Sequence, residues 1–197
     1  MGFGLETTPA TDNLPPRGDV YPDQDAPVLR PTADGERLEL ASLRWGFPPI
    51  AKGKAVITNI RNLQSRWWRD VNRPYLLEPE YRCLVPFTAF AEPVRDPTWL
   101  AVPDKEAAFF AGIWRPWSGD RLAPVPGKTR RARQQGDWNL FAFLTTEANR
   151  IVRPVHEKAM PVILHDPAEC REWLSGGDAS LRLQRPLPDC ELRIKSL

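Results

Sequence analysis

The proline content, 22 residues in a chain of 197, constrains the fold of this sequence more than any other feature. Proline has no backbone N–H and its ring clashes with the preceding helical turn, so a proline inside a helix removes a hydrogen bond and bends or ends the helix. The sequence shows no internal repeat and no low-complexity tract. It therefore predicts strands, turns and loops, with helices few and short.

The length and composition indicate one globular domain spanning residues 1–197. Hydrophobic residues make up 42% of the chain and charged residues 26%. The net charge of +2 is too small for a general attraction to nucleic acid, so such a partner must be attracted by a local patch. No apolar run reaches the length of a membrane span and no signal-peptide pattern is present, so we expect a cytoplasmic monomer without membrane contact.

Cysteine and histidine are too few and too scattered to indicate a metal site. Cys83, Cys170 and Cys190 form no CxxC pair, and the only histidines are His156 and His165. We expect reduced thiols, no metal and no cofactor.

The pattern of apolar and turn-forming residues predicts nine strand regions and two short helices. The expected helices are 63–71, ending before Pro74, and 166–176, which has an Asp cap and Pro in its first turn. Residues 1–12 are expected to be irregular. The predicted strand regions are 27–31, 37–47, 55–60, 81–93, 98–103, 107–117, 138–148, 160–165 and 190–197.

Residues 121–137 form the one dense basic segment and are predicted to be a loop. Its dense cluster consists of Lys128, Arg130, Arg131 and Arg133. A solvated surface loop is the first interpretation, because charge runs usually face water. Contact with nucleic-acid phosphates is the alternative.

Several polar side chains stand where apolar strands are predicted to end. Such groups can converge on one rim of a sheet and point into a cleft. Each has an ordinary alternative, since a strand-end acid is usually solvated, an asparagine caps turns and a loop histidine is often merely hydrogen-bonded. The pattern alone indicates an acid/base pair beside an anion-binding arginine. These residues are Asn59, Arg61, Glu92, Thr145 and His156.

Six blocks of the sequence, taken in order, resemble the SOS-response-associated peptidase (SRAP) family. Each block is weakly specific alone, but their order over residues 13–190 is specific. The resemblance implies an α+β, mainly β, single domain with a barrel-like mixed sheet flanked by short helices. The blocks are RWGFPP (44–49), VITNIRN (56–62), RCLVPFTAFAEP (82–93), FAGIWRPW (110–117), FLTTEANRIVRPVHEKAMPVIL (143–164) and REWL (171–174).

The resemblance also implies roles for individual residues. Glu92 and His156 match the catalytic glutamate and histidine, and Asn59 matches the asparagine that positions the N-terminal residue. Arg61 matches an arginine that grips a backbone phosphate, and Thr145 falls where the family has a hydroxyl near DNA.

Further DNA contacts are expected from a basic side chain and from aromatic rings. Lys158 follows His156 at a place where the family has a basic residue. Trp67 and Trp68 are candidates for stacking on unpaired bases, with Trp45 as a third candidate that is better explained by core packing.

The function implied by the resemblance is sensing of abasic sites in single-stranded DNA. Family members expose an N-terminal cysteine by removing the initiator methionine, and this cysteine crosslinks to the ring-opened sugar as a thiazolidine. Glu92 and His156 would supply acid/base assistance. This sequence begins Met1-Gly2, and its first cysteine is Cys83.

Two explanations of this difference remain open. One is that the sequence begins at the wrong place relative to the natural chain, which we favour because the other site residues are retained. Alternatively, the protein is a natural variant that binds single-stranded or damaged DNA without covalent chemistry. A peptidase acting on other proteins ranks last, because no Ser/His/Asp or Cys/His arrangement is visible.

Overall fold

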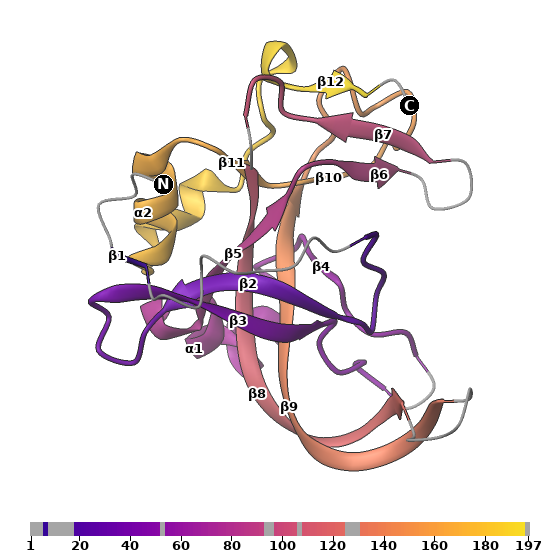
Figure 1. The fold of residues 1–197 in the computed structure, drawn as a ribbon, viewed down its shortest axis with the longest axis vertical. Coiled ribbons are helices and arrows are strands. Elements are labelled where there is room, and N and C mark those ends of the chain that lie inside the picture. The colour runs from indigo at the N-terminus through magenta and orange to yellow at the C-terminus, as the bar shows by residue number, and fades with distance from the viewer. Residues whose placement is uncertain are drawn as a thin grey trace.

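Five strands close on themselves into a mixed barrel (Figure 1). The computed structural model describes residues 6–7, 18–51, 54–92, 97–105, 108–124 and 131–195. Neighbours around the barrel are antiparallel, except that β3 and β9 pair in parallel and so complete the ring. The barrel strands are β2 (Asp25–Pro31), β3 (Arg37–Trp45), β5 (Arg82–Phe87), β8 (Ala108–Pro124) and β9 (Arg131–Thr146).

Short strands extend the barrel at its edges. β4 (Asn59–Ile60) pairs in parallel with β9, and β10 (Met160–Pro161) pairs antiparallel with the end of β9. β11 (Ile163–Leu164) pairs with β8, and β1 (Glu6–Thr7) pairs in parallel with β3. Strand β9 therefore pairs with four other strands: β3, β4, β8 and β10.

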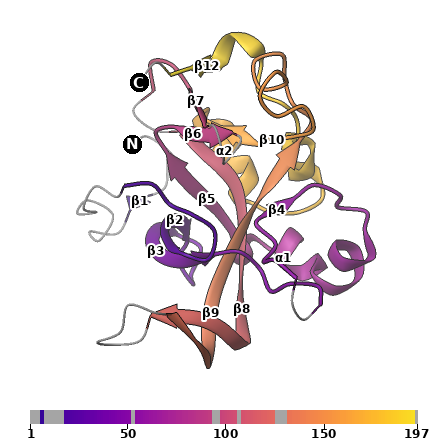
Figure 2. The same cartoon turned by 90° about the vertical axis from the view of Figure 1, so that its right-hand side faces the viewer.

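A separate small sheet covers one end of the barrel. Its order is β12 (Arg193–Ile194), β7 (Thr98–Ala101) and β6 (Phe90–Glu92), all antiparallel. Figures 1 and 2 both place β6 beside β10, at the end of the molecule opposite the tip of the β8–β9 hairpin.

The helices are short, and the predicted mainly β fold with few helices is confirmed. No helix in the described part of the chain is long and apolar enough to cross a membrane. The α-helices are α1 (Arg73–Leu77) and α2 (Pro167–Leu174), and the other helical turns are Trp67–Val71, Pro79–Tyr81, Ala179–Leu183 and Asp189–Glu191.

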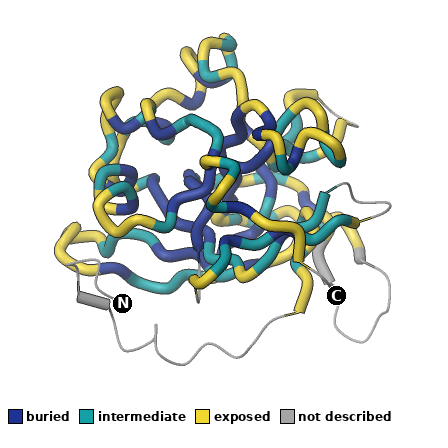
Figure 3. Tube along the Cα trace, turned by 90° about the horizontal axis from the view of Figure 1, so that it is seen from above, coloured by how far each residue is buried: buried dark blue, intermediate teal, exposed yellow. Residues whose placement is uncertain are grey.

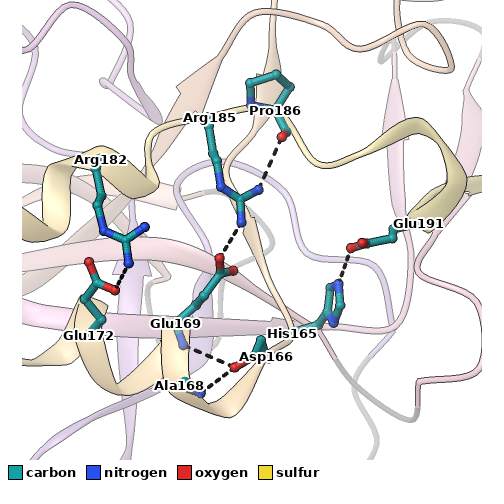
Figure 4. A network of polar contacts seen from close by, with 9 residues as sticks. All are labelled: His165, Asp166, Ala168, Glu169, Glu172, Arg182, Arg185, Pro186 and Glu191. Atoms are coloured by element: carbon teal, nitrogen blue, oxygen red, sulfur yellow. Dashed lines mark hydrogen bonds and ion pairs between the residues drawn. The ribbon is translucent and has the colours of Figure 1, made fainter.

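Helix α2 begins as the sequence predicts. The Asp166 side chain accepts hydrogen bonds from the backbone N–H groups of Ala168, at 2.6 Å, and Glu169, at 3.4 Å. Ion pairs then fasten the following segment, residues 179–191, to this region (Figure 4): Arg182 with Glu172, Arg185 with Glu169, and His165 Nε2 with Glu191 Oε2 at 2.6 Å.

Several element boundaries differ from the sequence predictions. Residues 121–137 are not a loop: β8 runs to Pro124 and β9 begins at Arg131, so the segment is mostly hairpin. Lys128 and Arg130 lie outside the described residues. Of the predicted buried strand 55–60, only Asn59–Ile60 is a strand, and residues 1–12 include β1.

Other corrections concern breaks within predicted elements. The region from 81 to 93, for which the sequence predicts a strand pair or one strand bent around Pro86, forms two strands that belong to different sheets and separate after Phe87. The 160–165 strand is divided between β10 and β11, which pair with different barrel strands. The predicted helix 63–71 is the helical turn Trp67–Val71, which ends before Pro74 as predicted, and Pro74 lies in the first turn of α1, where its missing N–H costs nothing.

Alternate residues of the strands belong to two buried clusters. Leu140, Ala142 and Leu144 of β9 pack with helical residues that include Trp173. Phe141 and Phe143 pack in the other cluster, with Phe90 and Leu100 of the small sheet. We call the second cluster the phenylalanine side. Figure 3 shows the buried trace running through the middle of the molecule.

Asp23 ties the entry of β2 to β3 and β8. Its Oδ1 lies 2.9 Å from Arg44 Nε and 2.6 Å from Arg121 Nη2, and the two arginine side chains are only 5% and 4% exposed. Arg121 also donates to the Gly46 carbonyl at 3.0 Å. Burial opposes ionisation of Asp23, but hydrogen bonds and attraction from Arg44 and Arg121 outweigh it and hold the pKa of this carboxyl below its usual range.

We predict that Asp23→Asn destabilises the protein by about 3 kcal/mol, because two nearly buried guanidinium groups lose their shared counter-charge. Asparagine keeps the shape and tolerates the positive φ of 67° at this position. Thermal unfolding at pH 7 should show a fall of about 6–12 °C. Asp178→Ala, which removes an exposed partner of Arg73, is the control and should change stability by less than about 0.5 kcal/mol. Equal effects of the two substitutions would contradict this assignment.

Candidate active site

Glu92 and His156 meet although 63 intervening residues separate them in sequence. The Nδ1 atom of His156 lies 3.1 Å from Oε2 of Glu92, and the side chains are 38% and 22% exposed. The contact is close but poorly aligned, since Nδ1 is shielded from solvent without a hydrogen bond of ordinary geometry. Catalytic contacts are commonly misaligned in the absence of substrate and tighten when it binds.

The surroundings of Glu92 favour its protonated form. Burial raises the pKa of this carboxyl above its usual range, and the attraction and hydrogen bonding of His156 offset only part of that effect. Glu92 has the same orientation on β6 as Phe90, which belongs to the phenylalanine side. A partly buried acid beside an imidazole is suited to exchange protons with it.

Strand periodicity brings the other predicted residues to the same side. Ile60 of β4 packs in the opposite cluster, so its strand neighbour Asn59 has the opposite orientation, and Arg61 follows directly after the strand. Thr145 follows Leu144 in β9 and shares the orientation of Phe143. Asn59 and Arg61 are exposed, whereas Thr145 is 4% exposed.

Arg61 connects β4 to the loop that carries His156. Its Nη1 donates to the backbone carbonyl of Lys158, two residues after the histidine. Arg61 and Lys158 line an open cleft of about 400 Å³ together with Glu147, Arg153 and Glu157. Three cations and two carboxylates therefore line this cleft, so cationic groups are available there although the carboxylates offset most of their charge.

The three tryptophans proposed from sequence have different positions. Trp68 is 5% exposed and packs against Phe47, which removes it from the side chains available to stack on a base. Trp67 is half-buried and lines a separate depression with Trp117 and Arg115. Trp45 is also half-buried, with its ring centroid 5.4 Å from that of Phe143 and its Nε1 donating to the Thr58 carbonyl beside Asn59.

Some residues of the site could not be anticipated from the sequence. The Gln184 side chain donates to the carbonyls of Arg61 and Thr145, both at 2.9 Å, from the far end of the chain. Glu147, Arg153 and Glu157 line the cleft but follow no pattern that distinguishes them from surface charges. Among the described residues, no cluster of His, Cys, Asp or Glu could hold a metal ion.

The sequence model of the SRAP family, "SOS response associated peptidase", matches residues 2–196. The chain belongs to the SRAP family. Comparison with curated proteins finds no significant match.

Solved structures share the fold of this SRAP protein. A protein from Bordetella bronchiseptica superposes with a TM-score of 0.69 and 21% identity over 99% of this chain and 92% of its own. A protein from Bacteroides thetaiotaomicron gives 0.61 and 21%, over 87% and 72% of the two chains. A phage-related protein from Bordetella bronchiseptica gives 0.60 and 22%, over 92% and 81%.

We predict that Glu92→Gln makes this SRAP protein more stable at pH 7.5. The raised pKa of Glu92 means that folding is favoured while the carboxyl is protonated, and this contribution is lost as pH rises through the folded-state pKa. The thermal midpoint of Glu92→Gln should exceed that of the native protein at pH 7.5, and the difference should shrink below pH 4.5. Glu36→Gln, on an exposed turn, should leave the midpoint unchanged at both pH values. A less stable Glu92→Gln at pH 7.5 would show that Glu92 is held as a favourable anion.

Proposed function

We propose that this SRAP protein binds single-stranded DNA and processes abasic sites, with Glu92 and His156 moving the protons. The observation that carries the proposal is their 3.1 Å contact, together with the hydrogen bond from Arg61 to the Lys158 carbonyl, two residues after His156. An acid/base pair beside an arginine fits a substrate that combines a reactive sugar with a phosphate.

The chemistry needs proton transfer at two stages. An abasic sugar opens when the proton leaves its anomeric hydroxyl and another is added to the ring oxygen, which yields an aldehyde. An amine then adds to the aldehyde carbon, and loss of water gives an imine. Burial raises the pKa of Glu92, which suits this carboxyl to the role of the acid, while the His156 ring accepts or returns the proton.

Arg61 and Lys158 are suited to hold the strand on either side of the sugar. Arg61 uses one N–H on the Lys158 carbonyl, and its fork keeps further donors for a phosphate. With a net charge of only +2, attraction of DNA depends on this local group of cations in the cleft.

The amine of the covalent reaction is the α-amine of the N-terminal residue, and a cysteine there would close a thiazolidine by adding its thiol to the imine carbon. Cys83 and Cys170 cannot replace it, because both are fully buried and burial raises the pKa of the Cys170 thiol to about 12. A second candidate function is non-covalent binding of single-stranded or damaged DNA, which the cations lining the cleft favour without any covalent step.

A denaturing gel separates the two functions. The Gly2→Cys variant should give a retarded band with an abasic single-stranded oligonucleotide and none with an undamaged one. Adding Glu92→Gln should slow formation of the band at least about 100-fold, because the amide cannot exchange a proton. An unchanged rate would remove Glu92 from the mechanism. DNA binding without a band in any variant would favour the non-covalent function.

For DNA binding itself, we predict that Arg61→Ala weakens affinity for an undamaged single strand about tenfold. It should also reduce the slope of log K against log salt by about 0.7, the value for one phosphate contact on a single strand. Fluorescence anisotropy over a salt series measures both. Arg66→Ala, which removes a 92% exposed side chain nearby in sequence, is the control. A slope that Arg61→Ala leaves unchanged would contradict phosphate contact by Arg61.

A further inference from the structure

Gln184 holds together two strands that carry site residues. Its Nε2 donates to the backbone carbonyl of Arg61, just after β4, and to the carbonyl of Thr145 in β9. Both distances are 2.9 Å, which is ideal for an amide donor. One carboxamide therefore fixes the separation of two backbones, both of which belong to the proposed DNA-binding side.

The segment that carries Gln184 is itself firmly held. The backbone N–H of Gln184 donates to the Leu181 carbonyl at 3.0 Å, at the end of the helical turn Ala179–Leu183. On either side, Arg182 pairs with Glu172 and Arg185 pairs with Glu169 of α2 (Figure 4). The backbone that carries Gln184 is therefore held in place by these contacts.

The same segment also supports the loop that carries His156. The Nδ2 of Asn149 donates to the Leu187 carbonyl at 2.9 Å, and the Arg150 N–H donates to Asp189 Oδ1 at 2.9 Å. From Arg61, the guanidinium continues the connection to the Lys158 carbonyl. Hydrogen bonds therefore lead from Gln184 through Arg61 to the residues next to His156.

We propose that Gln184 is a positioning residue, which sets the placement of Arg61 and of the His156–Lys158 loop for DNA binding. This inference rests on the proposed function, since it specifies how the DNA-binding side is held. Gln184 is half-buried and its known contacts are with backbone carbonyls, so its role is to place other groups rather than to bind the strand.

The test is the isosteric substitution Gln184→Glu, which preserves shape but places an acceptor against two carbonyl oxygens. We expect affinity for an undamaged single strand to fall about tenfold at pH 7.5. Relative to the native protein at each pH, the deficit should shrink at pH 4.5, where a protonated Glu can donate one hydrogen bond. Hydrogen exchange of the DNA-free protein should quicken around Arg61 and Lys158 but not in α2.

Two further variants make the result specific. Asp178→Ala removes an exposed ion pair with Arg73 just before the same segment, and its affinity and exchange near Arg61 should match the native protein. Gln184→Met, of similar length but without donors or charge, should reproduce the loss of affinity if Gln184→Glu fails to fold.

The outcomes separate this inference from the proposed function. Native affinity and unchanged exchange near Arg61 in the Gln184 variants would overturn the positioning role. If the native protein binds no single-stranded DNA, the proposed function fails. Hydrogen exchange of the DNA-free Gln184 variants then tests the positioning role by itself. Faster exchange near Arg61 and Lys158 supports that role, and unchanged exchange rejects it.

Discussion

The backbone pairing of β9 with four other strands is the constraint on which the rest of the structure depends. Pairing with β3 closes the barrel, and pairing with β8 forms its longest hairpin. Pairing with β4 places Asn59 and Arg61 beside the end of β9, near Thr145. Pairing with β10 brings the chain back to β9 after the loop that carries His156. A slip of one residue in β9 would exchange its two faces and separate the site residues.

The two faces of β9 pack in different clusters. One face packs Leu140, Ala142 and Leu144 against the helical part of the molecule. The other packs Phe141 and Phe143, and the polar rim continues from this phenylalanine side. Burial of Glu92 beside this side of the barrel is the physical reason that its carboxyl is harder to ionise than a surface acid.

Local patterns in the sequence predicted the elements well where neighbouring residues determine them. Asp166 and Pro167 predict the start of α2, and the apolar run before Glu92 predicts strands that end on that acid. The sequence predicts a loop over 131–137 because this stretch is charged and contains glycine. In a two-stranded hairpin both faces can be polar, so the alternation of apolar and polar residues that marks a strand is missing. Its strand character comes from pairing with β8.

Within the candidate site, the sequence indicated Asn59, Arg61, Glu92 and His156 because polar groups at the ends of apolar strands stand out. It could not indicate Gln184 or Asp23, since each acts on partners at least 21 residues away and has no local signature. Trp68 shows the opposite error: an aromatic pair suggests base stacking, yet only tertiary packing decides which ring is buried.

The most direct test of the account is proton NMR of the two histidines during titration with a single strand that contains a stable abasic-site analogue. The chain has only His156 and His165, so a His165→Gln variant assigns both ring signals. The account predicts that the His156 signals shift on binding, while those of His165, paired with Glu191, stay in place. Binding that leaves His156 unmoved would contradict the placement of the abasic sugar against Glu92 and His156.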